Sequence, residues 1–372
     1  MKKIAVFHFN PVELYPPAMN FLNCLQKRLG ENDQVWVYTT HPTEDVELYI
    51  PSGNQITMKR IASYPMYLPA IHRLLQYLRY YMVSFLQCLR FKPSEIIYYE
   101  TISSFTPYLM IQWPGRRADL FIHYHEYMTD VEYRKMLLNN LFHRLEKKIY
   151  RKAKWISHTN KYRMQLFLND LGSPHLTNTH IFPNYPPAEW ESATRDNITR
   201  PVRLIYAGAL GSIEMLYIRE VFEWIKSKSG EVELDIYSFK VAKEIKAYSR
   251  QLSCPFIHWR GSVAYKDLPK ILTQYDIGLI LYKGLSANTI YSAPNKLFEY
   301  LVCGLDVWCP EELTGTHEYI SQRYWPKVLQ LDFLKLDQYD LDELIERKKD
   351  HRRQIIYTCE KAGTELITKI SL

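Results

Sequence analysis

The chain has 372 residues, which is enough for two domains with separate hydrophobic cores. Hydrophobic residues make up 47% of it, which excludes a disordered chain, and a net charge of +7 is too modest to require a nucleic-acid partner. The six cysteines form no C-x-x-C pair and no histidine lies at zinc spacing. We therefore expect reduced thiols, no metal site and a cytoplasmic protein.

The amino-terminal residues do not predict a targeting or membrane segment. Met1–Val6 has too short an apolar run for a signal peptide. No uninterrupted apolar stretch approaches the roughly 20 residues that a membrane helix needs.

Short apolar runs alternate with helical patterns through the first half, which is typical of a doubly wound α/β domain. A helix is expected over Pro16–Leu29. The expected strands are Ile4–Phe9, Val35–Thr39, Ile56–Ile61, Ile96–Tyr99, Leu120–His125 and Trp155–Thr159. Ligands of such sheets gather at the carboxyl ends of the strands.

Residues 66–91 form a basic, aromatic segment with helical periodicity. It admits two interpretations. One is a domain helix that is well buried and has charged ends, and the pattern favours this slightly. The other is an amphipathic helix that rests on an anionic membrane surface, giving a peripheral membrane contact.

Two histidines, His123 and His125, end the strand that starts near Asp119. An imidazole there would be close to neutral at physiological pH and would exchange hydrogen bonds with a sugar hydroxyl. A lone histidine is more often a structural residue. His123 is expected to point to the other side of the strand and to be structural.

The clearest boundary is Ile181–Pro187, where three prolines in five residues are followed by a polar run to Arg200. The strand–helix pattern then restarts. A glycine-containing loop, Gly208–Ser212, precedes a helix expected from Ile213 to Lys226. Glycine there would let the backbone approach a phosphate, although it also marks ordinary turns. The further strands are Val202–Ala207, Leu234–Ser238, one entering the turn at Gly261, Asp276–Leu281, Asp306–Cys309 and Val328–Leu331, with a helix over Leu268–Tyr275 and a charged, helical tail from Asp340.

The stretch Ser292–Gly304 predicts a short helix, with Pro294 in its first turn and Gly304 just past its end. A helix start that carries Ser292, Asn295 and Lys296 is an anion site, because it combines free N–H groups, the dipole and a cation. Glu299, one turn further on, would accept protons from sugar hydroxyls. The alternative is an amphipathic helix with a solvated polar face.

This string, Pro294-Asn295-Lys296-Leu297-Phe298-Glu299-Tyr300, resembles the signature of retaining, family 4-type glycosyltransferases. The resemblance extends loosely over most of the chain. It implies the GT-B fold, with two Rossmann-like doubly wound α/β domains facing across a cleft. The implied domains are 1–184 for the acceptor, 185–200 as linker, 201–350 for the nucleotide sugar, and 351–372 as a helix that packs back on the first domain.

The resemblance also implies roles for individual residues. His125 reaches the donor sugar, Glu299 binds the nucleotide ribose, and the loop residues Asn10 and Glu126 contact the acceptor. The donor-binding set is Gly208, Leu210, Gly211, Ser212, Arg260, Gly261, Val263, Tyr291, Ser292, Asn295, Lys296 and Glu299.

The chain departs from the family pattern at three places. Its first loop has no glycine, no basic residue follows Gly211, and Tyr291 replaces a family Glu eight residues before Glu299. Lys296 and the helix start would then balance the diphosphate charge, without a metal or cofactor. Asp340-Leu341-Asp342 is interpreted as a solvated helix start.

We therefore expect a retaining glycosyltransferase that uses a nucleotide sugar and a glycan or polyprenyl-linked acceptor in surface polysaccharide biosynthesis. It would work in the cytoplasm or at the inner face of the membrane, without nucleic acid. The alternatives are an inactive nucleotide-sugar-binding partner protein and a sugar-nucleotide epimerase of the same fold.

Overall fold

A computed structural model of the chain describes residues 1–43, 46–64, 68–115, 117–172, 176–192, 197–347 and 357–370. It divides into two compact units, one formed by Met1–Asn184 with Cys359–Leu372 and the other by Tyr185–Thr358. The segment expected as a linker, 185–200, starts the second unit, where Trp190 is buried in the core. In the part of the chain that is described, no helix is long and apolar enough to cross a bilayer.

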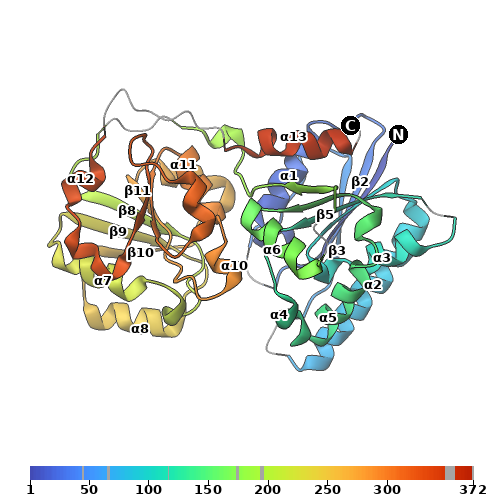
Figure 1. Ribbon diagram of the computed structural model, residues 1–372, viewed down its shortest axis with the longest axis horizontal. Helices are drawn as coiled ribbons and strands as arrows, with labels where there is room; N and C mark the ends of the chain where they lie inside the picture. The colour runs from blue at the N-terminus through green and yellow to red at the C-terminus, as the bar shows by residue number, and fades with distance from the viewer. Residues whose placement is uncertain are drawn as a thin grey trace. The chain divides into compact units, whose positions relative to one another are not determined.

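The first unit is a seven-stranded parallel sheet in the order β3-β2-β1-β4-β5-β6-β7 (Figure 1). Its strands are β1 Lys3–His8, β2 Gln34–Thr40, β3 Ile56–Ile61, β4 Glu95–Tyr99, β5 Asp119–Tyr124, β6 Ala153–His158 and β7 Thr179–Ile181. Ile4 pairs with Val35 and with Glu95 on its two sides. Since both faces are buried, the central strands are continuous apolar runs, as the sequence indicated.

Helices cover both faces of this sheet. The helices of the unit are α1 Pro16–Gln26, α2 Ala70–Phe91, α3 Phe105–Gln112, α4 Asp130–Arg134, α5 Leu137–Glu146, α6 Lys161–Leu171 and α13 Cys359–Lys369, with 3-10 turns at Val12–Leu14, Thr101–Ser103 and Tyr150–Lys152. The C-terminal helix α13 packs against α1, where the Cys24 and Cys359 sulfurs are 3.0 Å apart (Figure 1).

The second unit is a six-stranded parallel sheet in the order β10-β9-β8-β11-β12-β13. Its strands are β8 Val202–Ala207, β9 Val232–Tyr237, β10 Ile257–Gly261, β11 Ile277–Leu279, β12 Asp306–Pro310 and β13 Val328–Leu331. Its helices are α7 Ile218–Ser227, α8 Lys243–Leu252, α9 Leu268–Leu272, α10 Ala287–Ile290, α11 Asn295–Val302 and α12 Leu341–Ile345, with 3-10 turns at Ala188–Trp190, Ile213–Met215, Tyr265–Asp267, Thr314–Tyr319 and Phe333–Gln338.

The expected helix from Ile213 to Lys226 is therefore interrupted. A 3-10 turn ends at Met215, Leu216 is extended, and α7 starts at Ile218. The break follows from an antiparallel bridge between Leu216 and Tyr282, which takes the chain out of helical geometry.

Helix α2 is not the well-buried helix that the sequence slightly favoured. One face packs on the sheet through Tyr80, Tyr81 and Cys88, but large apolar side chains on the other face are exposed. The expected helix began at residue 66, and residues 66 and 67 lie outside the described part of the chain.

Candidate functional site

In the second unit, the loop after β8 lies against the side chain of Lys296. Gly208 has a φ of +143°, and a Cβ there would lie 2.5 Å from Lys296 Cε and 2.6 Å from its Nζ. Glycine is needed both for this backbone conformation and for the close approach. Leu210 in the same loop is buried and bridges to Val241, whereas a Cβ at Gly211 would meet open space.

Helix α11 begins at Asn295 after Pro294, which has extended backbone angles and acts as the N-cap. Its apolar side packs into the core of the second unit, as expected. The alternative of a solvated polar face is wrong, because only 6% of the Glu299 surface is exposed to solvent. The N–H of Leu297 donates to the Pro294 carbonyl at 2.9 Å, so the N–H groups of Asn295 and Lys296 are the ones at the helix start that can bind an anion.

Lys296 is a partly buried cation at this helix start. Its Nζ donates to the Tyr282 hydroxyl at 3.2 Å and lies 5.3 Å from the centre of the Tyr206 ring. Burial opposes the charge, but Tyr282, Tyr206 and Glu299 outweigh burial and raise the pKa of Lys296 above its usual value. Among the described residues, no carboxylate lies within ion-pairing distance of this ammonium. The ammonium therefore stays charged and has no direct ion pair among the described residues, so it is available to an anionic ligand.

Glu299 lies one turn further along the same helix. Burial raises its pKa to about 7, while Lys296 and a hydrogen bond from Tyr265 act in the opposite direction. Its ionised form accepts protons from hydroxyl groups and its neutral form is itself a donor. Its state near neutral pH therefore depends on what it binds.

The other predicted donor residues differ in their surroundings. The Nε of Arg260 donates to Asp235 at 2.8 Å, so its guanidinium is already paired. The Ser292 hydroxyl donates to the Thr289 carbonyl at 2.8 Å. The remaining ones lie on the surface or partly buried: Ser212 caps a 3-10 turn, Gly261 has a φ of +82°, Val263 packs at the edge of the core, Tyr291 ends α10, and Asn295 starts α11.

No pattern in the sequence indicates the role of Gly315. A Cβ at this residue would lie 2.3 Å from the carbonyl oxygen of Ser292. Gly315 therefore lets the chain pack directly on the turn that leads into α11. It shapes the candidate anion site without contacting it.

In the first unit, the carboxyl ends of β1 and β5 bring together His8 and His125. The rings lie 6.2 Å apart. His8 Nδ1 lies 2.6 Å from the carbonyl oxygen of Asn10, which only accepts, so Nδ1 carries the proton. His125 Nδ1 lies 3.1 Å from Asn184 Oδ1 and carries the proton for the same reason. The two Nε2 atoms are left as acceptors with no partner among the described residues.

Both imidazoles stay neutral in this environment. Burial lowers the pKa of His125 to about 3, and the nearby His8 adds to the effect. Burial also lowers the pKa of His8 to about 4. Each ring therefore keeps one unpaired lone pair, at a buried Nε2, over the whole physiological range.

The expectation that His123 points to the other side of its strand is wrong. The His123 and His125 rings are 4.7 Å apart and nearly perpendicular. Side chains two residues apart share a face of a strand, so the result follows from the strand period. His123 is fully buried and bonds to Ser157 Oγ at 2.8 Å, which is a structural role.

Glu100 is a residue that the sequence analysis missed. It follows β4 with a φ of 63° and a ψ of 150°, a region that residues other than glycine rarely adopt. Its Oε1 accepts the backbone N–H groups of His125 at 2.6 Å and Glu126 at 3.1 Å. Burial raises the pKa of Glu100 to about 8, and the neighbouring Glu126 adds to the rise. This strained residue fixes the loop that carries His125.

The two candidate acceptor residues lie on either side of these histidines. Asn10 donates from Nδ2 to the Tyr15 hydroxyl at 3.0 Å, and its carbonyl binds His8. The side chain of Glu126 is exposed, while its backbone is held by Glu100.

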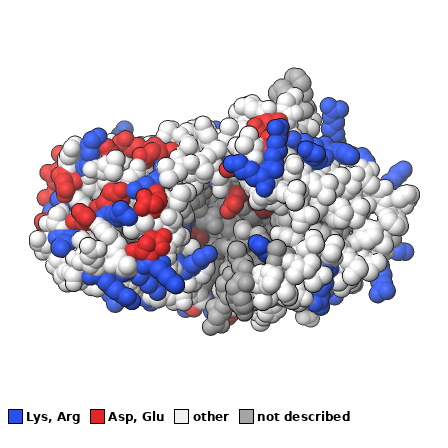
Figure 2. Space-filling view, turned by 90° about the horizontal axis from the view of Figure 1, so that it is seen from below, with Lys and Arg blue, Asp and Glu red and all other residues white. Residues whose placement is uncertain are grey.

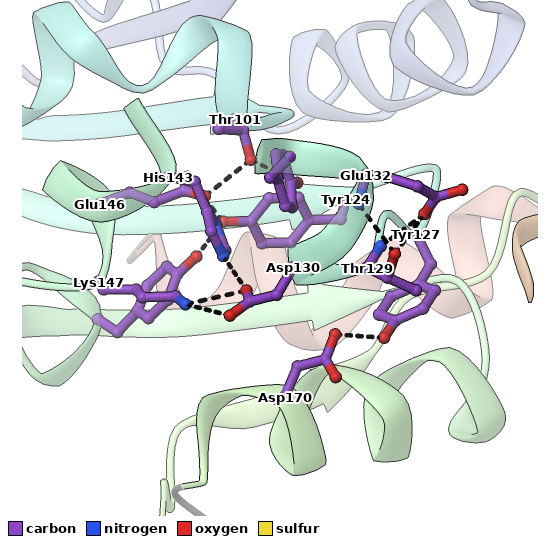
Figure 3. Close-up of polar contacts among 12 residues, drawn as sticks. Thr101, Tyr124, Tyr127, Thr129, Asp130, Glu132, His143, Glu146, Lys147 and Asp170 are labelled. Atoms are coloured by element: carbon purple, nitrogen blue, oxygen red, sulfur yellow. Dashed lines mark hydrogen bonds and ion pairs between the residues drawn. The ribbon is translucent and has the colours of Figure 1, made fainter. Parts of the chain in front are cut away.

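A buried polar cluster supports this end of the sheet (Figure 3). Glu146 of α5 has no exposed surface and accepts from the hydroxyls of Thr101, Tyr124 and Tyr98 at 2.7, 2.9 and 3.2 Å. His143 Nδ1 lies 2.9 Å from the same carboxylate. Because Thr101 follows Glu100 directly, the cluster anchors the strained turn to α5.

Among the described residues, one group of side chains could hold a metal ion, and it does not include His8, His125 or Lys296. It consists of Cys24, Cys359 and Glu360, between α1 and α13. The pair Asp340 and Asp342 instead starts α12, where Asp340 accepts the N–H of Asp342 at 2.8 Å.

No protein-family model and no curated protein sequence matches the chain. Its fold is similar to that of solved structures. The lipopolysaccharide outer core galactosyltransferase WaaB, in its apo form, has a TM-score of 0.65 and 12% identity over 100% of both chains. A glycosyltransferase from Rickettsia africae has a TM-score of 0.67 and 10% identity over 100% of this chain and 98% of the other.

A third similar structure is the UDP-GlcNAc 2-epimerase from Methanocaldococcus jannaschii, with a TM-score of 0.59 and 11% identity over 100% of this chain and 99% of the other. At such low identities the similarities establish the fold alone. Two parallel-sheet, Rossmann-like α/β domains of the GT-B class are confirmed.

Proposed function

We propose that the protein is a retaining glycosyltransferase of the family 4 type. It moves a hexose or amino sugar from a nucleoside diphosphate to a glycan or lipid-linked acceptor, in surface polysaccharide assembly. The observation that carries the proposal is Lys296, a cation at the start of α11 and against the Gly208 loop that has no ion pair among the described residues. The similarity to a lipopolysaccharide galactosyltransferase supports this choice within the fold class.

In this proposal the second unit binds the leaving group. Lys296 and the first-turn N–H groups of α11 stabilise the diphosphate as the bond from the anomeric carbon to its oxygen breaks. Ionised Glu299 accepts hydrogen bonds from the ribose hydroxyls. Lysine and helix supply the positive charge, so the proposal requires no metal ion.

The acceptor hydroxyl attacks the same face of the sugar, and its proton passes to the departing phosphate oxygen. The reaction then needs positioned substrates and no protein nucleophile. His125 keeps in this proposal the role that the resemblance implies, contact with the donor sugar, and its imidazole is neutral. Glu100 is a positioning residue, because it holds the backbone of His125 and does not contact the sugar.

The test measures binding and turnover with a panel of nucleotide sugars, for the wild type and for Lys296→Ala and Glu299→Gln. Lys270→Ala is the matched control, because Lys270 is an exposed lysine of the same unit and pairs with Asp267. We expect both site variants to lose donor binding and turnover while the control keeps them. Intact turnover in both site variants would refute the site.

Two other outcomes would replace the proposed function. Donor binding without turnover on any acceptor indicates a non-catalytic partner protein. Release of an epimerised sugar without an acceptor indicates an epimerase, which the similar 2-epimerase structure makes the second candidate.

A further inference from the structure

Helix α2 carries a continuous row of exposed apolar side chains. At about 100° per residue, the row occupies an arc of roughly 120° on one side of the helix. Leu78 and Met82, in its middle, are 58% and 60% exposed. The row consists of Ile71, Leu74, Leu75, Leu78, Met82 and Leu86. The opposite side of α2 packs on the sheet, so this row is not part of the core of the first unit.

The apolar surface extends to neighbouring elements. Trp113, at the end of α3, is exposed and makes an edge contact with Phe85 of α2 at 5.4 Å between ring centres. Helix α5 packs on α2 through Phe142 and Tyr81, and it exposes Leu137 and Leu141 (Figure 1). A surface of this extent on two adjacent helices is larger than the scattered apolar residues of an ordinary protein surface.

The charged residues of α2 are all basic. Helix α2 contains Arg73, Arg79 and Arg90, all exposed, and no Asp or Glu. Arg79 and Arg90 lie along one edge of the apolar row. On α5, Arg144 and the following Lys148 continue the face that carries Leu137 and Leu141. In Figure 2 the half of the view that shows the first unit is mostly white, with blue atoms at its margin and blue and red atoms nearer the middle of the view.

We propose that this face, the α2 surface, docks on an anionic lipid bilayer with α2 parallel to the membrane plane. Apolar residues flanked by arginine and an interfacial tryptophan are the pattern of helices that lie in the headgroup region. Pairing with a second copy is disfavoured, because the arginines of two copies would meet with no acidic residue on α2 to neutralise them.

The side of α2 opposite the α2 surface packs against the predicted acceptor edge of the first unit. Phe9 follows β1 and precedes Asn10, and its ring stacks on Tyr77 of α2 at 4.9 Å. The Tyr81 hydroxyl donates to the carbonyl of Ile102, two residues after Glu100, at 2.6 Å. Docking would thus bring the strand ends that carry His125 close to the membrane. Only this link to a lipid-linked acceptor rests on the proposed function.

The docking itself is tested without substrate, by co-sedimentation of the full chain with vesicles. Neutral phosphatidylcholine vesicles are compared with vesicles that also contain phosphatidylglycerol, at low and high salt. We expect binding to the anionic vesicles only, weakened by salt. Leu78→Ser with Met82→Ser should reduce partitioning by about tenfold or more, since two apolar side chains leave the bilayer.

Arg79→Gln with Arg90→Gln should weaken binding to anionic vesicles as well. The control is Phe239→Ser with Leu334→Ser, which removes two exposed apolar side chains from the second unit and should leave binding unchanged. Equal partitioning with neutral and anionic vesicles, or full binding by the Leu78 and Met82 double variant, would overturn the proposal. So would a dimer in solution that this double variant converts to a monomer.

Discussion

Replacing Gly208 by alanine perturbs the contact between the loop after β8 and Lys296, while Lys296 and Glu299 themselves are not mutated. The new Cβ would lie 2.5 Å from Lys296 Cε, whereas ordinary contacts begin at 3.4 Å. The end of the lysine side chain must therefore move by about 1 Å, the difference between these distances. Since the positive φ of Gly208 is also unfavourable for alanine, we expect a loss of roughly 1–3 kcal/mol in folding stability.

The larger effect is expected on ligand binding. Displacing the ammonium weakens a charge-assisted hydrogen bond to phosphate, worth roughly 1.5–3 kcal/mol. Nucleoside diphosphate affinity should then fall by about tenfold or more. Titration calorimetry with a panel of nucleoside diphosphates measures it. Gly172→Ala is the control for strain, since Gly172 also has a positive φ but no atom of the described residues within 4 Å of the added Cβ.

A double-mutant cycle decides whether Lys296 transmits the effect. If it does, Gly208→Ala should cause no further loss of affinity in a Lys296→Ala background. An equal loss in both backgrounds would refute the reasoning, as would unchanged affinity in Gly208→Ala alone.

Three other predictions concern buried carboxyl groups. Burial raises the pKa of Glu299 from 4.5 to about 7, so as the pH rises the unfolded chain releases this proton before the folded chain does. The protein should therefore lose about 3 kcal/mol of folding stability as the pH rises from 4.5 to about 7. Glu299→Gln should flatten this loss when stability is measured by chemical denaturation, and an unchanged pH profile would contradict the assignment. Glu100→Gly should relieve roughly 1–3 kcal/mol of backbone strain, yet it should lower transfer activity because the N–H of His125 loses its acceptor. Glu100→Gln keeps an acceptor oxygen and should keep most of the activity. Equal activity in both variants would argue against a positioning role. Glu146→Ala leaves buried donors unsatisfied and should cost about 3–5 kcal/mol of stability in urea unfolding; a loss below about 1 kcal/mol would show that water replaces the carboxylate.

The local pattern was sufficient to predict most of the sheet strands, because buried parallel strands are apolar on both faces. It failed where a distant contact changed the local outcome. The bridge from Leu216 to Tyr282 interrupts a segment that is helical by its own periodicity. The shared face of His123 and His125 was predictable from the strand period alone, and the error there was one of interpretation.

The candidate site was likewise predictable only where it depends on local sequence. The order Pro294-Asn295-Lys296 and the spacing to Glu299 are properties of the sequence, and they predict a helix start with a cation and a carboxylate on one side. No pattern reveals the strained backbone of Glu100, because strain arises from hydrogen bonds to His125 and Glu126, which are remote in the chain.

The sequence by itself determined the two α/β domains and the residues at the start of α11, since periodicity and helix-end preferences are local properties. Only the tertiary structure decided that Gly208 lies against Lys296, that Glu299 is buried, and that one side of α2 is left exposed. Burial and close approach depend on which remote segments pack together, and that information is not contained in any single stretch of the chain.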